Sequence, residues 1–103
     1  IFTIIFLFLY WRKMQYIEEI KQRITKNLSS AKIEIIDQSN QHSGHGDPNK
    51  GSHFNAIIIS TDFDGLSLIQ RHQKIYKILG KDMGSRIHAF SMKIFTPKEF
   101  TNS

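Results

Sequence analysis

The sequence predicts one α/β (α+β) domain with the element order α-β-β-α-β and a short helical turn at the C-terminus. Apolar residues recur every three or four positions in two stretches, and β-branched residues fill three shorter ones. The 103 residues fit a single domain and are too few for two cores. With 40% hydrophobic and 22% charged residues, the composition is that of an ordinary globular protein.

An apolar segment, residues 1–11, opens the chain and is followed at once by Arg12 and Lys13. It is too short to span a bilayer as a helix, and it resembles the end of a signal or anchor segment with basic residues on one flank. We therefore set residues 1–13 apart as a leader that we expect to be poorly ordered, and place the folded domain at residues 14–103. An organelle-targeting segment and an inaccurate gene boundary both explain such a leader, and the sequence does not choose between them.

A first helix is expected over about residues 15–28, with acidic residues in its first turn that suit the helix dipole. Its apolar face consists of Ile17, Ile20, Ile24 and Leu28. Residues 32–36 alternate between polar and apolar side chains, which predicts a strand. Residues 37–52 are rich in Gly, Asn, Ser and Asp without an apolar period, which predicts a long loop.

Residues 53–60 contain three consecutive isoleucines and predict a second strand that is buried on both faces. A second helix is expected over residues 66–79, after a turn in which Asp62 and Asp64 act as helix-capping residues. Residues 86–94 predict a third strand. After it, Thr96-Pro97-Lys98-Glu99 has the pattern of a helix start with Thr96 as the N-cap.

The connections between these elements predict the sheet topology. The first two strands should pair antiparallel across the long loop, and the second and third, joined by a helix, should run parallel. The end of the first strand and the beginnings of the other two then lie at one edge of the sheet. That edge would receive four of the five histidines, namely His42, His45, His53 and His88.

The composition also limits the chemistry. The chain has no cysteine, so it can supply no disulfide, thiolate ligand or thiol nucleophile. No nucleophile–base pair, phosphate-binding loop or carboxylate dyad is visible, so we expect no enzymatic activity. The formal net charge of +5 is mild, and a solvated basic surface explains it better than a surface that tracks nucleic-acid phosphates.

The chain from Met14 to Phe100 resembles the BolA-like family. The motifs that carry the resemblance are Ser52-His53-Phe54, Phe63-x-Gly65-x-Ser67, Arg71-His72, Ile87-His88-Ala89-x-Ser91 and Thr96-Pro97-x-Glu99, with Ile35-Ile36-Asp37-x-Ser39 and the histidine- and glycine-containing loop upstream. The family usually has Trp where Phe100 stands, and either side chain would serve as an aromatic plug. The resemblance implies a class II KH-like fold with a three-stranded mixed sheet.

The resemblance further implies a non-catalytic protein that pairs with a monothiol glutaredoxin and shares a [2Fe–2S] cluster with it, in cluster assembly, trafficking or iron sensing. It implies His88 as one ligand and a loop histidine as the other, where His42 matches the usual position best and His45 is the alternative. Thiolates from the glutaredoxin and from glutathione would complete a Rieske-like set of ligands. The isolated chain would hold no cofactor.

Alternatives remain open at several of these residues. Without the resemblance, His88 and the loop histidines would be structural or solvated residues. His53 favours a hydrogen-bonding role over ligation, and His72 the role of a hydrogen-bonded core histidine. Within the family, the histidine-containing loop favours a mitochondrion or another organelle, with the cytosol as the alternative. We expect no stable membrane insertion of the domain.

The second helix carries Arg71, Lys74 and Lys77, which we interpret as a docking face for the glutaredoxin. The same basic residues, with the KH-like topology, leave open a weak interaction with nucleic acid as a transcriptional regulator. KH domains clamp the nucleic-acid backbone with a GxxG loop, however, and the stretch from Gly80 to Gly84 is one residue too long for that motif.

Overall fold

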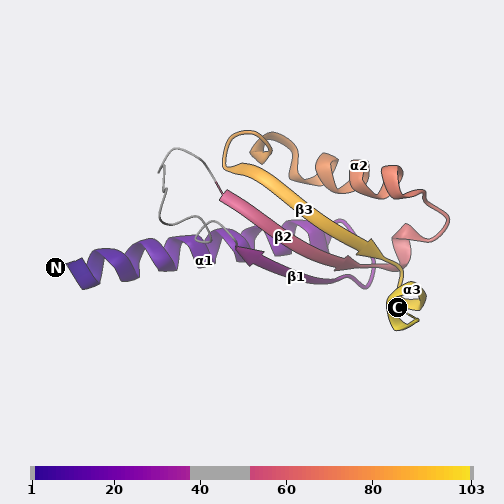
Figure 1. Cartoon of the computed structure of the whole chain (residues 1–103), viewed down its shortest axis with the longest axis horizontal. Coiled ribbons are helices and arrows are strands. Elements are labelled where there is room, and N and C mark those ends of the chain that lie inside the picture. Colours follow the sequence, from indigo (N-terminus) through magenta and orange to yellow (C-terminus); the bar gives the residue numbers. More distant parts are fainter. Residues whose placement is uncertain (1, 38–51, 103) are drawn as a thin grey trace.

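The structure is a computed structural model in which residues 2–37 and 52–102 are described (Figure 1). Its elements are α1 (Phe2–Lys26), β1 (Lys32–Asp37), β2 (Ser52–Ile59), the 3₁₀ turn η2 (Thr61–Phe63), α2 (Leu68–Leu79), the 3₁₀ turn η3 (Gly80–Asp82), β3 (Ile87–Phe95) and α3 (Pro97–Thr101). The α-β-β-α-β order and the helical turn at the C-terminus are therefore confirmed.

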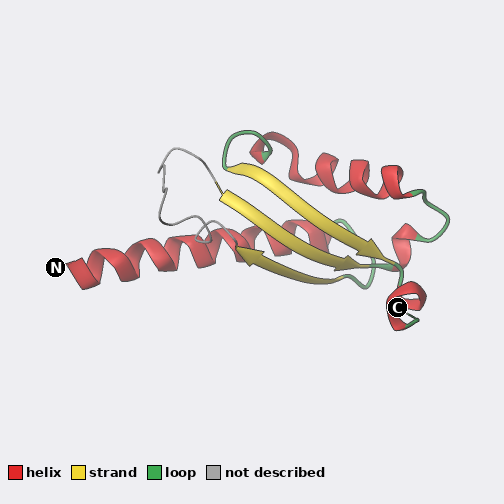
Figure 2. Cartoon of the chain, in the orientation of Figure 1, coloured by secondary structure: helices red, strands yellow, loops and turns green. Residues whose placement is uncertain are grey.

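The three strands form one mixed sheet in the order β1-β2-β3. β1 pairs antiparallel with β2, and β2 pairs parallel with β3, as the connections predicted. Figure 2 shows α3 beside the end of the sheet where β3 finishes, whereas α1 continues past the opposite end. The two ends of the sheet therefore differ in the helix that lies beside them.

Both long helices contribute to a single core against one face of the sheet. The stripe on α1 is buried as predicted, with Ile20 and Ile24 fully covered, and α2 adds Ile75 and Leu79. From the sheet this core takes the buried side chains of Phe54, Ala56, Ile58, Ile87, Phe90 and Ile94. Burial of this many large apolar side chains is the main favourable term in folding.

The expectation that β2 is buried on both faces is wrong. Phe54, Ala56 and Ile58 are buried, but Ile57 and Ile59 are only half-buried. Side chains alternate between the faces of a strand, and both helices lie on the face of Ile58. A run of three isoleucines is therefore compatible with a sheet that has helices on one face only, as well as with a sheet covered on both faces.

α1 begins at Phe2 instead of near residue 15, so the expectation of a poorly ordered leader is corrected for residues 2–13, which are helical. This stretch contains neither Gly nor Pro, and a helix already nucleated by its packed half extends at low cost. The acidic residues expected in the first turn lie in mid-helix, and Arg23 and Lys26 are the basic residues of the last turn. In the described part of the chain, no helix combines the length and the apolar character that crossing a bilayer requires.

The cap of α2 also differs from the prediction. Ser67, not Asp62 or Asp64, is its N-cap: its hydroxyl accepts a hydrogen bond from the Gln70 backbone N–H, and the Gln70 side chain accepts one from the Ser67 N–H. Asp62 instead accepts a hydrogen bond of 2.9 Å from the backbone N–H of Ser29. The carboxylate thus links the segment after α1 to the turn after β2, which sequence spacing could not indicate.

The start of α3 is as predicted. The Thr96 hydroxyl accepts a hydrogen bond from the Glu99 N–H at 3.2 Å, and Glu99 Oε1 accepts one from the Thr96 N–H at 2.7 Å. Pro97 occupies the first turn. Phe100 is 45% exposed with its ring centroid 5.6 Å from that of Phe95, so it covers the end of β3 only partly.

Candidate metal centre at one edge of the sheet

The backbone brings three chain segments to one edge of the sheet. Asp37, the last residue of β1, pairs with Phe54, and Ser52, the first residue of β2, pairs with Ile87 at the start of β3. We call residues 36–37, 52–54 and 87–89 the histidine edge. Figure 1 shows it at the end of the sheet past which α1 continues. The predicted meeting of these strand ends is therefore confirmed for the backbone.

Of the predicted ligands, only His88 has a backbone position that the structure describes. His88 is the second residue of β3, beside an irregularity in the β2–β3 register between Ser52 and His53. The side chain of His88, and the whole of His42 and His45, lie outside what the structure describes. Among the described residues there is no group of three or more metal-ligating side chains. The assignment of the metal ligands stays a prediction.

His53 lies at the same edge, where it pairs with Ala89 and is half-buried. Alternation along β2 places it on the face of Asn55 and Ile57, away from the helices. The predicted hydrogen-bonding role of His53 stays a prediction.

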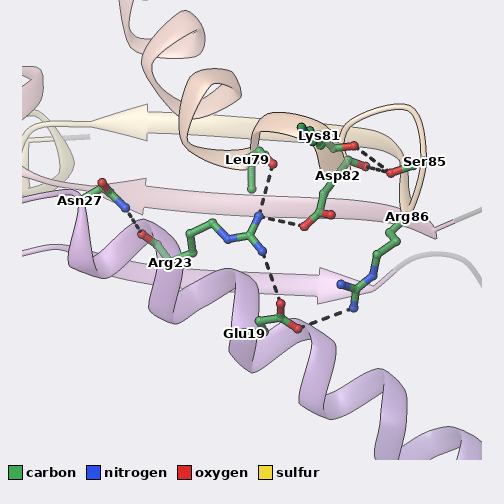
Figure 3. A network of polar contacts seen from close by, with 8 residues as sticks. All are labelled: Glu19, Arg23, Asn27, Leu79, Lys81, Asp82, Ser85 and Arg86. Carbon is green, nitrogen blue, oxygen red and sulfur yellow. Dashed lines mark hydrogen bonds and ion pairs between the residues drawn. The ribbon is translucent and has the colours of Figure 1, made fainter.

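A polar network holds the segment that leads into the histidine edge (Figure 3). The Arg23 guanidinium on α1 donates to Asp82 Oδ2 at 2.8 Å and to the Leu79 carbonyl oxygen at 3.3 Å. Its other terminal nitrogen lies 3.4 Å from Glu19 Oε1. The connection between α2 and β3 is thereby tied to α1, and this connection sets the position from which β3 begins.

Arg86, directly before β3, makes a second link to α1. Its guanidinium carbon lies 3.6 Å from the centroid of the Tyr16 ring, a cation–π contact, and Nη2 lies 3.6 Å from Glu19 Oε2. At the end of β1, Lys13 Nζ lies 2.8 Å from Asp37 Oδ2. The ends of β1 and β3 at this edge are therefore each joined to α1 by a charged side chain.

Tyr16 lies under this network. Its ring contacts Phe54, with 6.2 Å between the ring centroids, and only 8% of the residue is exposed. Burial, followed by the nearby charge of Asp82, raises the pKa of the Tyr16 hydroxyl, so the group stays neutral. Within the described part of the chain this buried hydroxyl has no hydrogen-bond partner.

Sequence reasoning did not single out Arg23, Arg86 or Tyr16. The spacing of Glu19 and Arg23 is that of a helical ion pair, which was a usable local signal. The more important partner, Asp82, is 59 residues away in the chain, and no local pattern indicates it.

Comparison with known proteins decides the family. A family model described as "BolA-like protein" matches residues 24–99. The chain belongs to the BolA-like family.

The share of each relative that the chain covers differs from one family member to the next. The chain is 36% identical over 81 residues to "DNA-binding transcriptional regulator BolA" of Haemophilus influenzae, covering 79% of this chain and 77% of that protein. It is 38% identical to "SufE-like protein 1, chloroplastic/mitochondrial" of Arabidopsis thaliana, over 78% of this chain but only 23% of the relative. The solved BolA domain of SufE1 from Arabidopsis thaliana matches with a TM-score of 0.67, covering 80% of this chain and 92% of that one.

The BolA-like domain uses Arg71 internally, although we predicted a docking role for it. Its guanidinium donates to the carbonyl oxygens of Leu66 at 3.0 Å and Ile94 at 3.3 Å. It also pairs with both carboxylate oxygens of Glu99, at 2.7 and 3.2 Å. Hydrogen bonding from Arg71 lowers the pKa of Glu99 from an ordinary value of 4.5 to about 2. These bonds hold Arg71 in place; its partner-binding role is not tested by them.

Other polar residues of α2 are more accessible. Lys74 is half-buried and Lys77 is exposed. The His72 Nδ1 atom lies 2.8 Å from the Leu68 carbonyl oxygen in the preceding turn, so His72 is hydrogen-bonded as predicted but only half-buried. Because α2 leads through η3 to β3, its last turn, with Lys77, lies toward the histidine edge, and Arg71 lies toward the other end (Figure 1).

Proposed function

We propose that this BolA-like protein is a non-catalytic partner of a monothiol glutaredoxin and binds a [2Fe–2S] cluster together with it, in cluster assembly, trafficking or iron sensing. The observation that supports this best is the meeting of strand ends at the histidine edge. The segment that carries His42 and His45 leaves the sheet after Asp37 and returns at Ser52. His88 lies at the start of β3 beside the start of β2, and β2 separates it from the end of β1.

The donor set fits half of such a cluster. His88 and His42, with His45 as the alternative, would supply two imidazole nitrogens to one iron. The chain has no cysteine, so both thiolates must come from the glutaredoxin and glutathione. Histidine ligation raises the reduction potential of such a cluster above that of an all-thiolate one. Only neutral imidazole binds metal, so acidification should weaken the complex.

Residues around the edge would support this role without touching the cluster. Arg23 and Arg86 hold the connection that leads into β3 against α1, which limits the positions open to the backbone of His88. Lys77, exposed near that end of α2, and Lys74 would carry most of the attraction for an acidic partner surface, because Arg71 is committed to Glu99.

The decisive experiment is anaerobic reconstitution of the chain with a monothiol glutaredoxin and glutathione. We expect a coloured heterodimer whose absorption and EPR spectra report histidine ligation. His88→Ala should abolish that spectrum, whereas the matched variant His72→Ala, on α2, should retain it. Circular dichroism checks that both variants are folded. An unchanged spectrum and cluster stability in His88→Ala would refute the proposal, and separate His42→Ala and His45→Ala variants then identify the loop ligand.

A second candidate function is regulation through nucleic-acid binding. The relative of Haemophilus influenzae carries that description, and the chain covers most of its length. Lys74, Lys77 and Lys81 lie on α2 and η3, where they could contact phosphates. Binding to duplex DNA should then weaken steeply with salt, and Lys77→Gln should reduce the salt slope by about one. An affinity for DNA that does not change with salt concentration would exclude this function.

We also propose a mitochondrion or another organelle as the location, with the cytosol as the alternative. The relative whose name includes "chloroplastic/mitochondrial" supports an organellar site in the family. Fractionation of cells that express the full chain tests this, and recovery in the cytosolic fraction alone would contradict it.

A further inference from the structure

The first turns of α1 present an apolar surface that the rest of the domain does not cover. Along residues 4–11, eight consecutive large side chains are each more than half exposed, from 51% at Ile5 to 71% at Ile4. We call residues 3–11 the apolar extension. Figure 1 shows this part of α1 beyond the sheet. It also precedes the range that matches the BolA-like family, residues 24–99.

The apolar side chains point in every direction around the helix axis. Successive residues of an α-helix are rotated by about 100°, so eight consecutive apolar positions leave no polar face. The later half of the same helix is different, because Ile17, Ile20 and Ile24 form one buried stripe and the intervening residues are polar. A protein groove covers one stripe of a helix, whereas the hydrocarbon of a bilayer surrounds a helix on all sides.

The boundary of the extension has the residue order of a membrane interface. Tyr10 and Trp11 come last, and Arg12 and Lys13 follow directly. Tyr and Trp prefer the headgroup level of a bilayer, and basic residues next to it attract anionic lipids. The nine residues of the extension measure about 14 Å as a helix, which is a little under half the thickness of the hydrocarbon core. These residues are therefore long enough to cross most of one leaflet.

We propose that the apolar extension inserts into one leaflet of a lipid bilayer, with Tyr10 and Trp11 at the interface and Arg12 against anionic headgroups. The Arg12 guanidinium carbon lies 6.0 Å from the Phe8 ring centroid, at the boundary between the apolar and charged parts. The folded domain stays outside the membrane, because its own apolar side chains fill its core.

Insertion of the extension also sets which end of the sheet faces the bilayer, because Lys13 links α1 to β1. The ion pair of Lys13 with Asp37 fixes α1 to the end of β1, at 2.8 Å. The histidine edge is therefore the part of the sheet that faces the bilayer. Membrane binding itself depends only on the extension and is independent of any metal ligand.

The chain contains its own reporter for the test, because Trp11 is the only tryptophan. The full chain is mixed with vesicles of phosphatidylcholine alone or with one-third phosphatidylglycerol, without glutaredoxin or iron. We expect a blue shift of the Trp11 emission, co-flotation with the vesicles, and binding about fivefold tighter to the anionic ones, as one arginine near a charged surface predicts. Lipids brominated near the glycerol should quench Trp11 more than lipids brominated at the chain ends.

Matched variants test whether vesicle binding depends on the apolar extension or on any exposed apolar side chain. Leu7→Glu should weaken vesicle binding about tenfold or more, because a charge replaces an apolar side chain in the hydrocarbon. Leu68→Glu makes the same change at a site on α2 that is 64% exposed, against 58% for Leu7, and should leave binding unchanged. Arg12→Gln should remove the preference for anionic vesicles. Circular dichroism confirms that each variant is folded.

Two results would overturn the proposal. The first is the absence of both flotation and a spectral shift with either kind of vesicle. The second is a Trp11 emission that is blue-shifted without vesicles and depends on protein concentration, together with a sedimenting dimer that Leu7→Glu dissociates. That result would assign the extension to contact with a second copy of the chain.

Discussion

At the end of the sheet where β2 and β3 finish, polar groups are held by partly buried hydrogen bonds to the backbone. Ser60 is fully buried, donates to the Ser29 carbonyl oxygen at 2.7 Å and accepts from the Asp62 N–H at 3.1 Å. Arg71, with 12% of its side chain exposed, donates to the carbonyl oxygen of Ile94. We call this the closed end of the sheet.

At the histidine edge, the described charged contacts to α1 are ion pairs in which at least one partner is about a third or more exposed. Arg86 and Glu19 are each about half exposed, Lys13 and Arg23 are 34% and 32% exposed, and their partners Asp37 and Asp82 are 15% and 16% exposed. Such pairs contribute little to stability and weaken with salt, whereas breaking a buried bond leaves a polar group unsatisfied. The closed end is therefore the more strongly held of the two, and the contacts between α1 and the histidine edge, where the proposed partner would dock, are the weaker ones.

The largest effect on stability should come from removing the Arg71 side chain at the closed end. Arg71→Ala should lower the free energy of unfolding by about 2–3 kcal/mol, because the Leu66 and Ile94 carbonyls lose a charged donor and Glu99 loses its partner. Urea denaturation measures this change. Lys77→Ala, an exposed cation on the same helix, is the control and should change stability very little. A loss under about 1 kcal/mol for Arg71→Ala would show that the two ends do not differ in this way.

A smaller effect should appear as a pH dependence at the closed end. The pKa of Glu99 is lowered to about 2, so its stabilising charge is fully present above the ordinary value of 4.5 and is lost as the pH falls from 4.5 to about 2. Glu99→Gln keeps an oxygen for the Thr96 N–H but removes the charge. The stability difference between the native chain and Glu99→Gln should therefore shrink toward zero across this window.

Thermal unfolding at a series of pH values measures that difference. Glu18→Gln is the matched control, because Glu18 is 59% exposed and its pair with Lys21 is 3.7 Å long. Its difference from the native chain should change little with pH. A difference for Glu99→Gln that stays constant from pH 4.5 to about 2 would contradict the assigned role of Arg71.

The smallest effect should be at the histidine edge. Lys13→Gln should cost about 0.5 kcal/mol at low salt and nothing measurable near 1 M salt, since about a third of the Lys13 side chain is open to solvent. Urea denaturation at two salt concentrations tests this. The effect of Arg71→Ala should largely survive high salt, because two of its bonds go to the part-buried carbonyl oxygens of Leu66 and Ile94 and not to an opposite charge. Equal salt sensitivity of the two variants would remove the contrast between the two ends.

Much of the fold was predictable because its signals are local. The α1 stripe and the capping box that joins Thr96 to Glu99 are each contained within a few turns or residues. The meeting of strand ends at the histidine edge followed from connection lengths and handedness. The candidate site was therefore predictable as a location. Its supporting residues were not, because Arg23 and Asp82 are 59 residues apart.

The sequence by itself determined the order of helices and strands, the direction of each strand and the edge at which the strand ends meet, because periodicity, caps and connections act over short distances along the chain. Only the tertiary structure decided that Asp62 accepts a hydrogen bond from Ser29, 33 residues away in the chain, and that Arg71 pairs with Glu99 at the closed end of the sheet. It also decided that the first turns of α1 stay exposed. These outcomes depend on which surfaces meet in space, and an amino-acid pattern does not specify what lies opposite it.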